Sequence, residues 1–182
     1  VLVAGNVISA IGTDAVAPDT DTLVIDGNGR TLMPGLIDNH VHITMSSWSQ
    51  QEALADGMTA AKLEVRAAEQ AEAMLLRGFT SARDLGGPIF GLKAGIDKGK
   101  YNGPRIWPSG AMISQTSGHG DGRLPNERSR RFFNEVSKSE NLGVNFIADG
   151  RDEVLTATRE NLRFGASQIK VMAGGGAATD YD

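Results

Sequence analysis

The chain has 182 residues, of which 40% are hydrophobic and 22% are charged, a composition typical of a globular protein that can bury a core. Its formal net charge is −4 and its lysines and arginines are scattered, which argues against a nucleic-acid partner. No apolar run reaches the roughly eighteen residues of a membrane helix, so we expect no membrane partner. Because cysteine is absent, any metal site must use histidine, carboxylate or a modified lysine.

Residues 1–34 read as short strands at 1–3, 7–11, 23–26 and 31–33, separated by glycine, asparagine and proline turns. This pattern predicts a small antiparallel sheet. The sequence opens at Val1 without a methionine and stops at Asp182 soon after an apolar run, so we expect an N-terminal fragment of a longer protein. The compartment stays open, with the cytoplasm slightly favoured.

Beyond Pro34 the pattern changes to alternating strands and helices with a longer period, which we interpret as βα units within residues 35–182. Apolar residues at three- and four-residue steps predict helices within 53–77 and over 151–164, and a shorter one follows Pro88 up to about Gly99. The expected strands are 36–43, 79–84, 105–113 and 167–173. A glycine-rich, charged loop is expected after the third strand, through roughly residue 150.

The first four βα units of a (β/α)8 TIM barrel account for this pattern, because four units in roughly 140 residues cannot complete a barrel of ~250 residues. An open doubly wound sheet is the competing architecture, but no Gly-x-Gly-x-x-Gly follows the first strand. The glycine-rich segment 174–178 lacks the lysine and hydroxyl residue of a phosphate loop. We interpret it as a backbone bend at the mouth of the barrel.

The segment 33–42 reads Met-Pro-Gly-Leu-Ile-Asp-Asn-His-Val-His and ends in two histidines two residues apart. Side chains two apart on a strand point the same way, so His40 and His42 should project from one face about 7 Å apart along the chain, with Asp38 on the same face. Imidazole is a good ligand for zinc and related ions, and a rigid strand lowers the cost of ordering the site. A pair of buried histidines satisfied by hydrogen bonds is the alternative.

Four stretches resemble the metal-dependent amidohydrolases, in the branch of imidazolonepropionase-like and prolidase-like enzymes that includes Xaa-Arg/Lys dipeptidases. They are residues 32–42, 78–86, 103–110 with 116–121, and 165–172. The resemblance implies a (β/α)8 barrel, to which residues 35–182 contribute the first half, beside a small β-sandwich that includes residues 1–34. It also implies water-driven cleavage of amide-like bonds with zinc or another divalent metal. We further expect a homo-oligomer.

Lys170 lies between Ile169 and Val171 in a strand expected to be buried, where lost hydration disfavours the charged amine. A neutral amine can capture carbon dioxide. The resemblance implies this outcome, because Lys170 matches the position of a carboxylated lysine that bridges two metal ions. The alternative is a lysine whose stem is buried and whose ammonium group reaches water.

His119 has glycines on both sides, which would let its ring swing over the metal centre. The resemblance implies that this histidine contacts the substrate or the developing oxyanion, a catalytic role that it would share with Lys170. A solvated loop histidine is the alternative. Asp84, Arg83 and Arg123 could face the same mouth, although an ion pair or a surface charge explains each equally well.

These residues lead to the hypothesis of a two-zinc hydrolase. His40 and His42 would hold one ion, carboxylated Lys170 would bridge it to a second, and a metal-bridging hydroxide would attack the carbonyl. The remaining ligands would come from strands five, six and eight, so the chain alone is expected to be inactive. The expected substrate is a small molecule or dipeptide, and the resemblance favours release of a C-terminal, possibly basic, amino acid.

Two alternatives to this hypothesis stay open. One is a mononuclear cyclic-amide hydrolase or deaminase of the imidazolonepropionase-like type, which the metal count would distinguish from the two-metal dipeptidase. The other is a non-catalytic scaffold that keeps the fold. Intact His40, His42 and Lys170 argue against a scaffold, because it has no need of these side chains.

Overall fold

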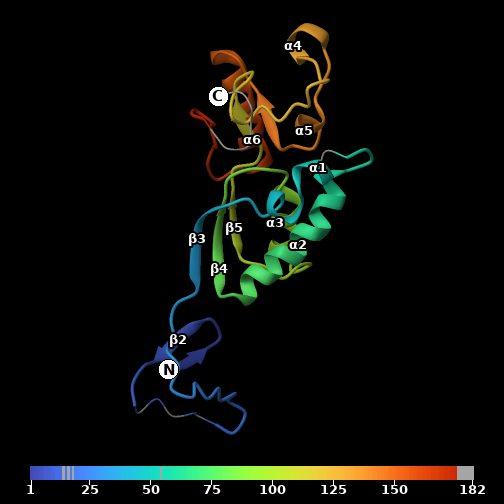
Figure 1. Cartoon of the computed structure of the whole chain (residues 1–182). Coiled ribbons are helices and arrows are strands. Elements are labelled where there is room, and N and C mark those ends of the chain that lie inside the picture. The colour runs from blue at the N-terminus through green and yellow to red at the C-terminus, as the bar shows by residue number, and fades with distance from the viewer. Residues whose placement is uncertain (14, 16, 18, 54, 176–182) are drawn as a thin grey trace. The chain divides into compact units, whose positions relative to one another are not determined.

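The computed structural model describes residues 1–13, 15, 17, 19–53 and 55–175, and the chain divides into two compact units, Val1–Pro34 and Gly35–Asp182 (Figure 1). In the first unit, β1 (Leu2–Ala4) and β2 (Val7–Ala10) form an antiparallel hairpin. The turn between them uses Gly5, whose φ of 63° suits glycine. No described helix is long and apolar enough to cross a membrane.

The strands predicted at 23–26 and 31–33 are wrong, because both segments are irregular. A strand needs a neighbour to receive its backbone hydrogen bonds, and no described segment pairs with either one. Their side chains are accordingly open to solvent, with Leu23 83% and Ile25 81% exposed.

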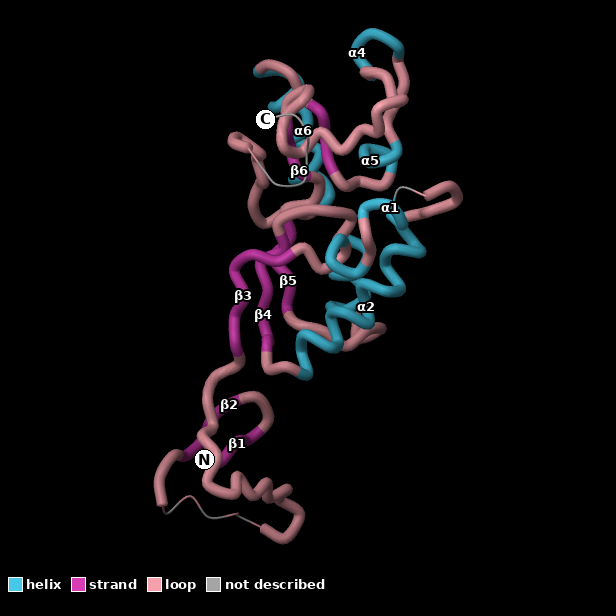
Figure 2. The backbone as a smooth tube through the Cα atoms, viewed as in Figure 1, coloured by secondary structure: helices cyan, strands magenta, loops and turns pink. Residues whose placement is uncertain are grey.

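The second unit contains a three-stranded parallel sheet in the order β3-β4-β5 (Figure 2). The strands are β3 (Leu36–Val41), β4 (Phe79–Asp84) and β5 (Arg105–Pro108). Helix α2 (Ala60–Leu76) connects the first two strands and α3 (Phe90–Asp97) connects the second and third. A 3-10 turn, η1 (Met45–Ser47), and the short helix α1 (Gln50–Ala53) precede α2. This alternation confirms the predicted α/β class.

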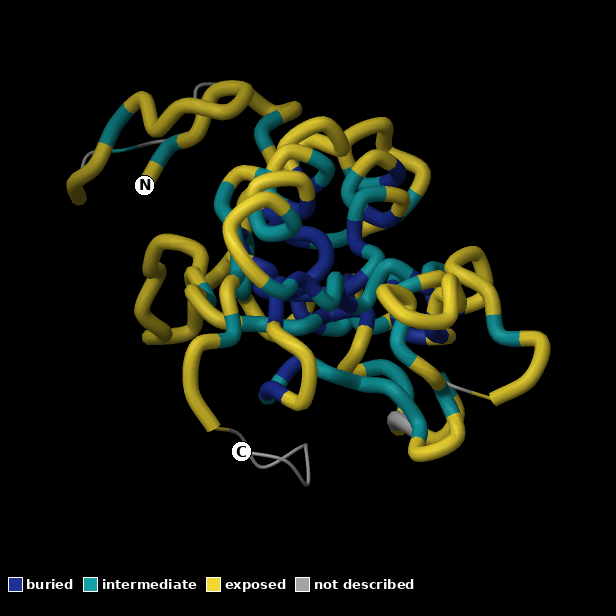
Figure 3. The backbone as a smooth tube through the Cα atoms, turned by 90° about the horizontal axis from the view of Figure 1, so that it is seen from above, coloured by how far each residue is buried: buried dark blue, intermediate teal, exposed yellow. Residues whose placement is uncertain are grey.

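Thr59 caps the N-terminus of helix α2, and its hydroxyl accepts a hydrogen bond from Lys62 N at 3.3 Å. Its buried residues recur at helical spacing, and all of them except Leu63, which packs against Leu142, belong to the core beside the sheet. Buried positions gather in the interior of the second unit (Figure 3). The core there consists of Ile43, Ala67, Ala71, Met74, Ala82, Ile89, Leu92 and Ile106.

The strand predicted at 105–113 is in fact two strands in two sheets. β5 ends at Pro108, and β6 (Met112–Ser114) pairs in parallel with β7 (Asn145–Ile147). Gly110 makes the break, because its φ of 73° is left-handed and a Cβ there would lie 2.6 Å from Asn161 Oδ1. The predicted loop through residue 150 therefore contains a strand, together with the short helices α4 (Arg130–Phe133) and α5 (Lys138–Asn141).

Helix α6 (Arg151–Phe164) ends at Gly165, as predicted. In place of the strand predicted at 167–173, the structure has a single parallel bridge between Val171 and Ile113. Ile113 N donates to Lys170 O at 2.9 Å, and Met172 N donates to Ile113 O at 2.8 Å. The segment that carries Lys170 thus lies alongside β6.

Candidate metal centre and adjoining cavity

His40 and His42 lie at the carboxyl end of β3, with ring centroids 5.3 Å apart and planes at 61°. The buried carboxylate of Asp84, at the end of β4, fixes the backbone that follows His42. It accepts hydrogen bonds from Ile43 N at 2.7 Å and from Gly86 N at 3.2 Å. Burial raises the pKa of Asp84 to about 7, although these two hydrogen bonds act in the opposite direction.

Asp38 does not share the face of the histidines, contrary to the sequence prediction. The register of β3 against β4 shifts between Asp38 and Val41, which breaks the strict alternation of side chains. Asp38 instead lines a hollow with Val41 and with Met74 of α2, on the side of the strand that faces the helix.

The half-buried imidazole of His42 is suited to metal binding in its neutral form. Burial lowers its pKa and the charges on His40 and Lys170 lower it further, although a backbone interaction with Gly86 acts in the opposite direction. Lys170 is therefore close enough for its charge to act on His42. The Nδ1 atom of His42 is buried and, among the described residues, has no hydrogen-bond partner. In the tautomer that carries its proton on Nε2, this nitrogen has a lone pair available to a ligand.

His119 lies in the loop after β6, and internal hydrogen bonds hold this loop in place. Gly120 N donates to Ser114 Oγ at 3.0 Å, and Ser117 N donates to Asp121 Oδ2 at 2.8 Å. Burial alone would raise the pKa of Asp121, but hydrogen bonds from Arg123 and Ser117 outweigh it and leave this pKa below its usual value. The ring of His119 places Nδ1 3.3 Å from Gly174 O, on the segment that follows Lys170.

The three other charged residues considered from the sequence have structural partners. Arg123 forms an ion pair with Asp121. Arg83 donates from Nε to Asn39 O at 2.7 Å, on the exposed side of β4. Asp84 is occupied with backbone groups.

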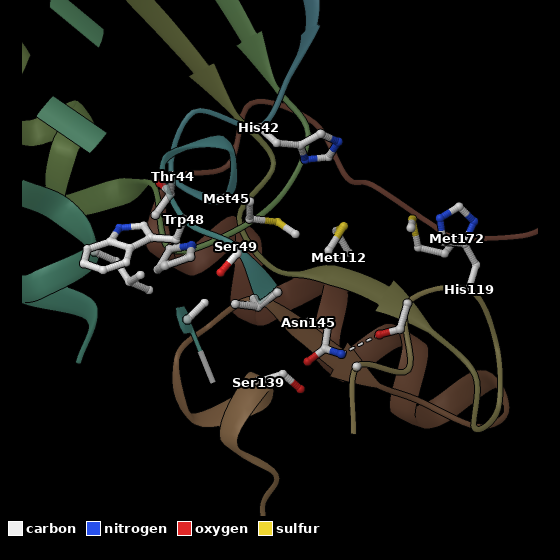
Figure 4. A pocket seen from close by; sticks show the side chains of 16 residues that line it. His42, Thr44, Met45, Trp48, Ser49, Met112, His119, Ser139, Asn145 and Met172 are labelled. Atoms are coloured by element: carbon white, nitrogen blue, oxygen red, sulfur yellow. Dashed lines mark hydrogen bonds between the residues drawn. The ribbon is translucent and has the colours of Figure 1, made fainter. Parts of the chain in front are cut away.

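A cavity of about 370 Å³ adjoins these residues, and both His42 and His119 line it (Figure 4). Its other walls come from the segment after β3, from β6, from α5 and β7, and from the segment after Lys170. The side chains that sequence reasoning missed include Thr44, Met45, Trp48, Met112, Ser139, Asn145 and Met172. Thr44 and Trp48 could have been predicted as cavity residues because they closely follow the histidine pair in the sequence. Asn145 could not, because no motif surrounds it.

Residues 31–180 match the model of the amidohydrolase family. The chain belongs to this family. An ochratoxinase of Aspergillus niger is 34% identical over 188 aligned residues, which cover 100% of this chain and 39% of the relative. The chain thus spans about two-fifths of the length of this curated relative.

Two crystal structures of similar proteins support the same family. One, of an amidohydrolase, superposes with a TM-score of 0.75 at 37% identity, covering 93% of this chain and 40% of that one. The other is a prolidase complexed with N-methylphosphonate-L-proline, with a TM-score of 0.70 at 37% identity, covering 82% of this chain and 36% of that one. The predicted membership in the amidohydrolases, in the prolidase-like branch, is confirmed.

The donors present in this amidohydrolase fit part of a metal site. Two imidazoles, one of them with a buried unpartnered nitrogen, and a lysine amine come together at the carboxyl end of β3 and beside β6. Within the described ranges, no three histidine, cysteine, aspartate or glutamate side chains are grouped so that they could hold an ion. A complete coordination shell therefore needs further ligands.

Proposed function

We propose that the full-length protein is a metal-dependent hydrolase of amide or peptide bonds, of the dipeptidase type that releases a C-terminal amino acid. The observation that carries the proposal is the buried Nδ1 of His42, which has no hydrogen-bond partner of good geometry within the described residues, on a ring whose neutral form is favoured and which lines a cavity together with His119. The relatives named prolidase and ochratoxinase support the same reaction class.

In this proposal His40 and His42 hold one divalent ion, with zinc the favoured metal. Lys170 holds a second ion after its amine nitrogen adds to carbon dioxide and loses a proton, which gives a carbamate with two oxygen donors. When bound, the ions activate water and polarise the scissile carbonyl. The backbone hydrogen bonds of Ile113 with Lys170 O and Met172 N fix the main chain from which the lysine stem extends.

His119 contributes a proton-bearing group at the cavity. A carbonyl oxygen only accepts hydrogen bonds, so Nδ1 must donate to Gly174 O, and the neutral ring then presents Nε2 as an acceptor. Nε2 donates to a substrate oxygen only when the ring carries both protons. His119 therefore stabilises a developing oxyanion in its protonated form.

Hydrolysis assays on the purified full-length protein, loaded with zinc in bicarbonate buffer, test this proposal. We expect cleavage of dipeptides or N-acyl amino acids, and we expect His119→Gln to lower kcat by about a hundredfold, the loss found when one oxyanion donor is removed. Ring opening of cyclic amides without peptide cleavage would instead indicate the mononuclear alternative. Zinc-loaded protein that cleaves neither class would indicate a scaffold.

A further inference from the structure

Unsatisfied polar atoms are concentrated in residues of the cavity wall beside His42. Among the residues that the structure describes, four buried side-chain polar atoms lack a hydrogen-bond partner, and all four belong to residues that line this cavity. They are Nδ1 of His42, Oγ1 of Thr44, Nε1 of Trp48 and Oδ1 of Asn145. Buried polar groups are normally paired, so this concentration in one place points to a ligand that pairs with them.

The three atoms that the metal proposal does not use offer a definite hydrogen-bonding pattern. Asn145 is 1% exposed and its Nδ2 already donates to Gly120 O, so Oδ1 is an acceptor fixed in position. Trp48 Nε1 can only donate, and its indole ring is held by the guanidinium of Arg66, 4.2 Å from the ring centroid. The hydroxyl of Thr44, on a residue 1% exposed, can donate or accept.

Apart from Ser49, Ser139 and His119, the remaining described walls are apolar. Thioethers of Met45, Met112 and Met172 line the cavity together with the indole, and none of its described lining residues is an aspartate, glutamate, lysine or arginine. A volume of about 370 Å³ lies at the lower end of the range for small-molecule sites, roughly 300–1,000 Å³. A cation buried here would have no partner, which is costly, whereas methionine and tryptophan suit aromatic and thioether groups.

We propose that this cavity binds a side chain of the substrate and selects a neutral, largely apolar group, aromatic or thioether, next to a polar group that pairs with Asn145 and Trp48. This inference rests on the proposed hydrolase function and specifies its substrate class. It differs from the expectation of a basic amino acid, because the described residues that line the cavity include no carboxylate to pair with a lysine or arginine side chain.

Specificity measurements on the full-length, zinc-loaded protein test the selection. Two dipeptide series, Ala-Xaa and Xaa-Ala, place phenylalanine, methionine, lysine or arginine on either side of the bond. In one series we expect kcat/KM for phenylalanine or methionine to exceed that for lysine or arginine by about tenfold or more. Equal or higher values for the basic residues in both series would overturn the inference while leaving the hydrolase proposal intact.

A charge placed in the cavity gives a sharper test. Met45 is 36% exposed, so a polar side-chain end can be accommodated there. Met45→Glu should lower the ratio of kcat/KM for the phenylalanine dipeptide to kcat/KM for the lysine dipeptide by about tenfold or more. The ratio is taken within each variant, which cancels any effect on metal content. Val65→Glu, at a residue 58% exposed on α2 and outside the cavity, adds the same charge and should leave the ratio unchanged. Equal ratios in the two variants would contradict the proposal.

Thr44→Val separates binding of a ligand from a structural role. The hydroxyl has no partner within the described chain, so its removal should leave the thermal midpoint unchanged or raise it. KM for the preferred substrate should nevertheless rise about three- to tenfold, the worth of one hydrogen bond. Unchanged KM would mean that water alone satisfies this atom and would overturn its assignment to the substrate.

If no peptide is cleaved, calorimetric titration still decides the matter. Binding of N-acetylphenylalanine in preference to N-acetyllysine, weakened in Met45→Glu, would support the cavity although the hydrolase proposal had failed. Failure to bind either compound would overturn the cavity proposal as well.

Discussion

The carboxylate of Asp84 should make the stability of the metal-free protein depend on pH. Asp84 is 0% exposed, and burial raises its pKa from 3.8 to about 7. The unfolded chain ionises this group near pH 3.8, so between that pH and about 7 the folded state keeps a proton that the unfolded state releases. The stabilisation of the folded state by protonated Asp84 is complete below pH 3.8 and is lost as the pH rises through about 7. At about 1.4 kcal/mol per pH unit, the loss is at most roughly 4 kcal/mol.

Urea unfolding of the metal-free, full-length protein between about pH 4.5 and 7.5 measures this effect, with Asp84→Asn as the variant that cannot ionise. The wild type should lose up to roughly 3 kcal/mol more unfolding free energy than the variant over this range. The amide replaces only one of the two acceptors for Ile43 N and Gly86 N, a cost that does not vary with pH and therefore cancels. Parallel pH profiles for the two proteins would refute the reasoning.

Two further substitutions test the geometry around the site. Gly86→Ala would place a Cβ 2.6 Å from Met112 Cγ and 3.3 Å from His42 Nδ1, so zinc content should fall and kcat/KM should drop about tenfold to a hundredfold. Gly27→Ala, whose Cβ would meet nothing closer than 3.7 Å, is the control, and retained zinc in Gly86→Ala would contradict the geometry. Asn161→Ala should cost about 2–5 kcal/mol by urea unfolding, because its amide bonds both Ala111 N at 3.0 Å and Ala111 O at 2.8 Å. A cost below about 1 kcal/mol would show that these backbone groups find other partners.

Local patterns predicted the elements whose formation depends on local interactions. The apolar spacing of α2 and α6 and the glycines that follow them gave helices close to those observed. Residues 105–113 were predicted as one strand because an apolar sequence does not show that the chain turns at Gly110 from one sheet to another. β7 was missed because its pairing with β6 joins segments about thirty residues apart, which periodicity cannot detect.

The candidate site likewise contains residues that could be predicted from the sequence and residues that could not. The motif with His40 and His42 and the segment with Lys170 could be singled out from sequence, and in the structure the charge of Lys170 acts on His42. Asp38 was misplaced because a shift of strand register leaves no trace in the residue pattern. The polar atoms of the cavity could not be foreseen, since Asn145 reaches it only through the pairing of β7 with β6.

The count of tightly bound metal ions tests the central claim most directly. Full-length protein prepared with zinc and bicarbonate should contain about two ions per chain by elemental analysis, as two-metal hydrolases do. Lys170→Ala should lose at least one of them, and His42→Ala should also lower the count. A single ion per chain that Lys170→Ala leaves in place would contradict the two-metal account and favour the mononuclear alternative.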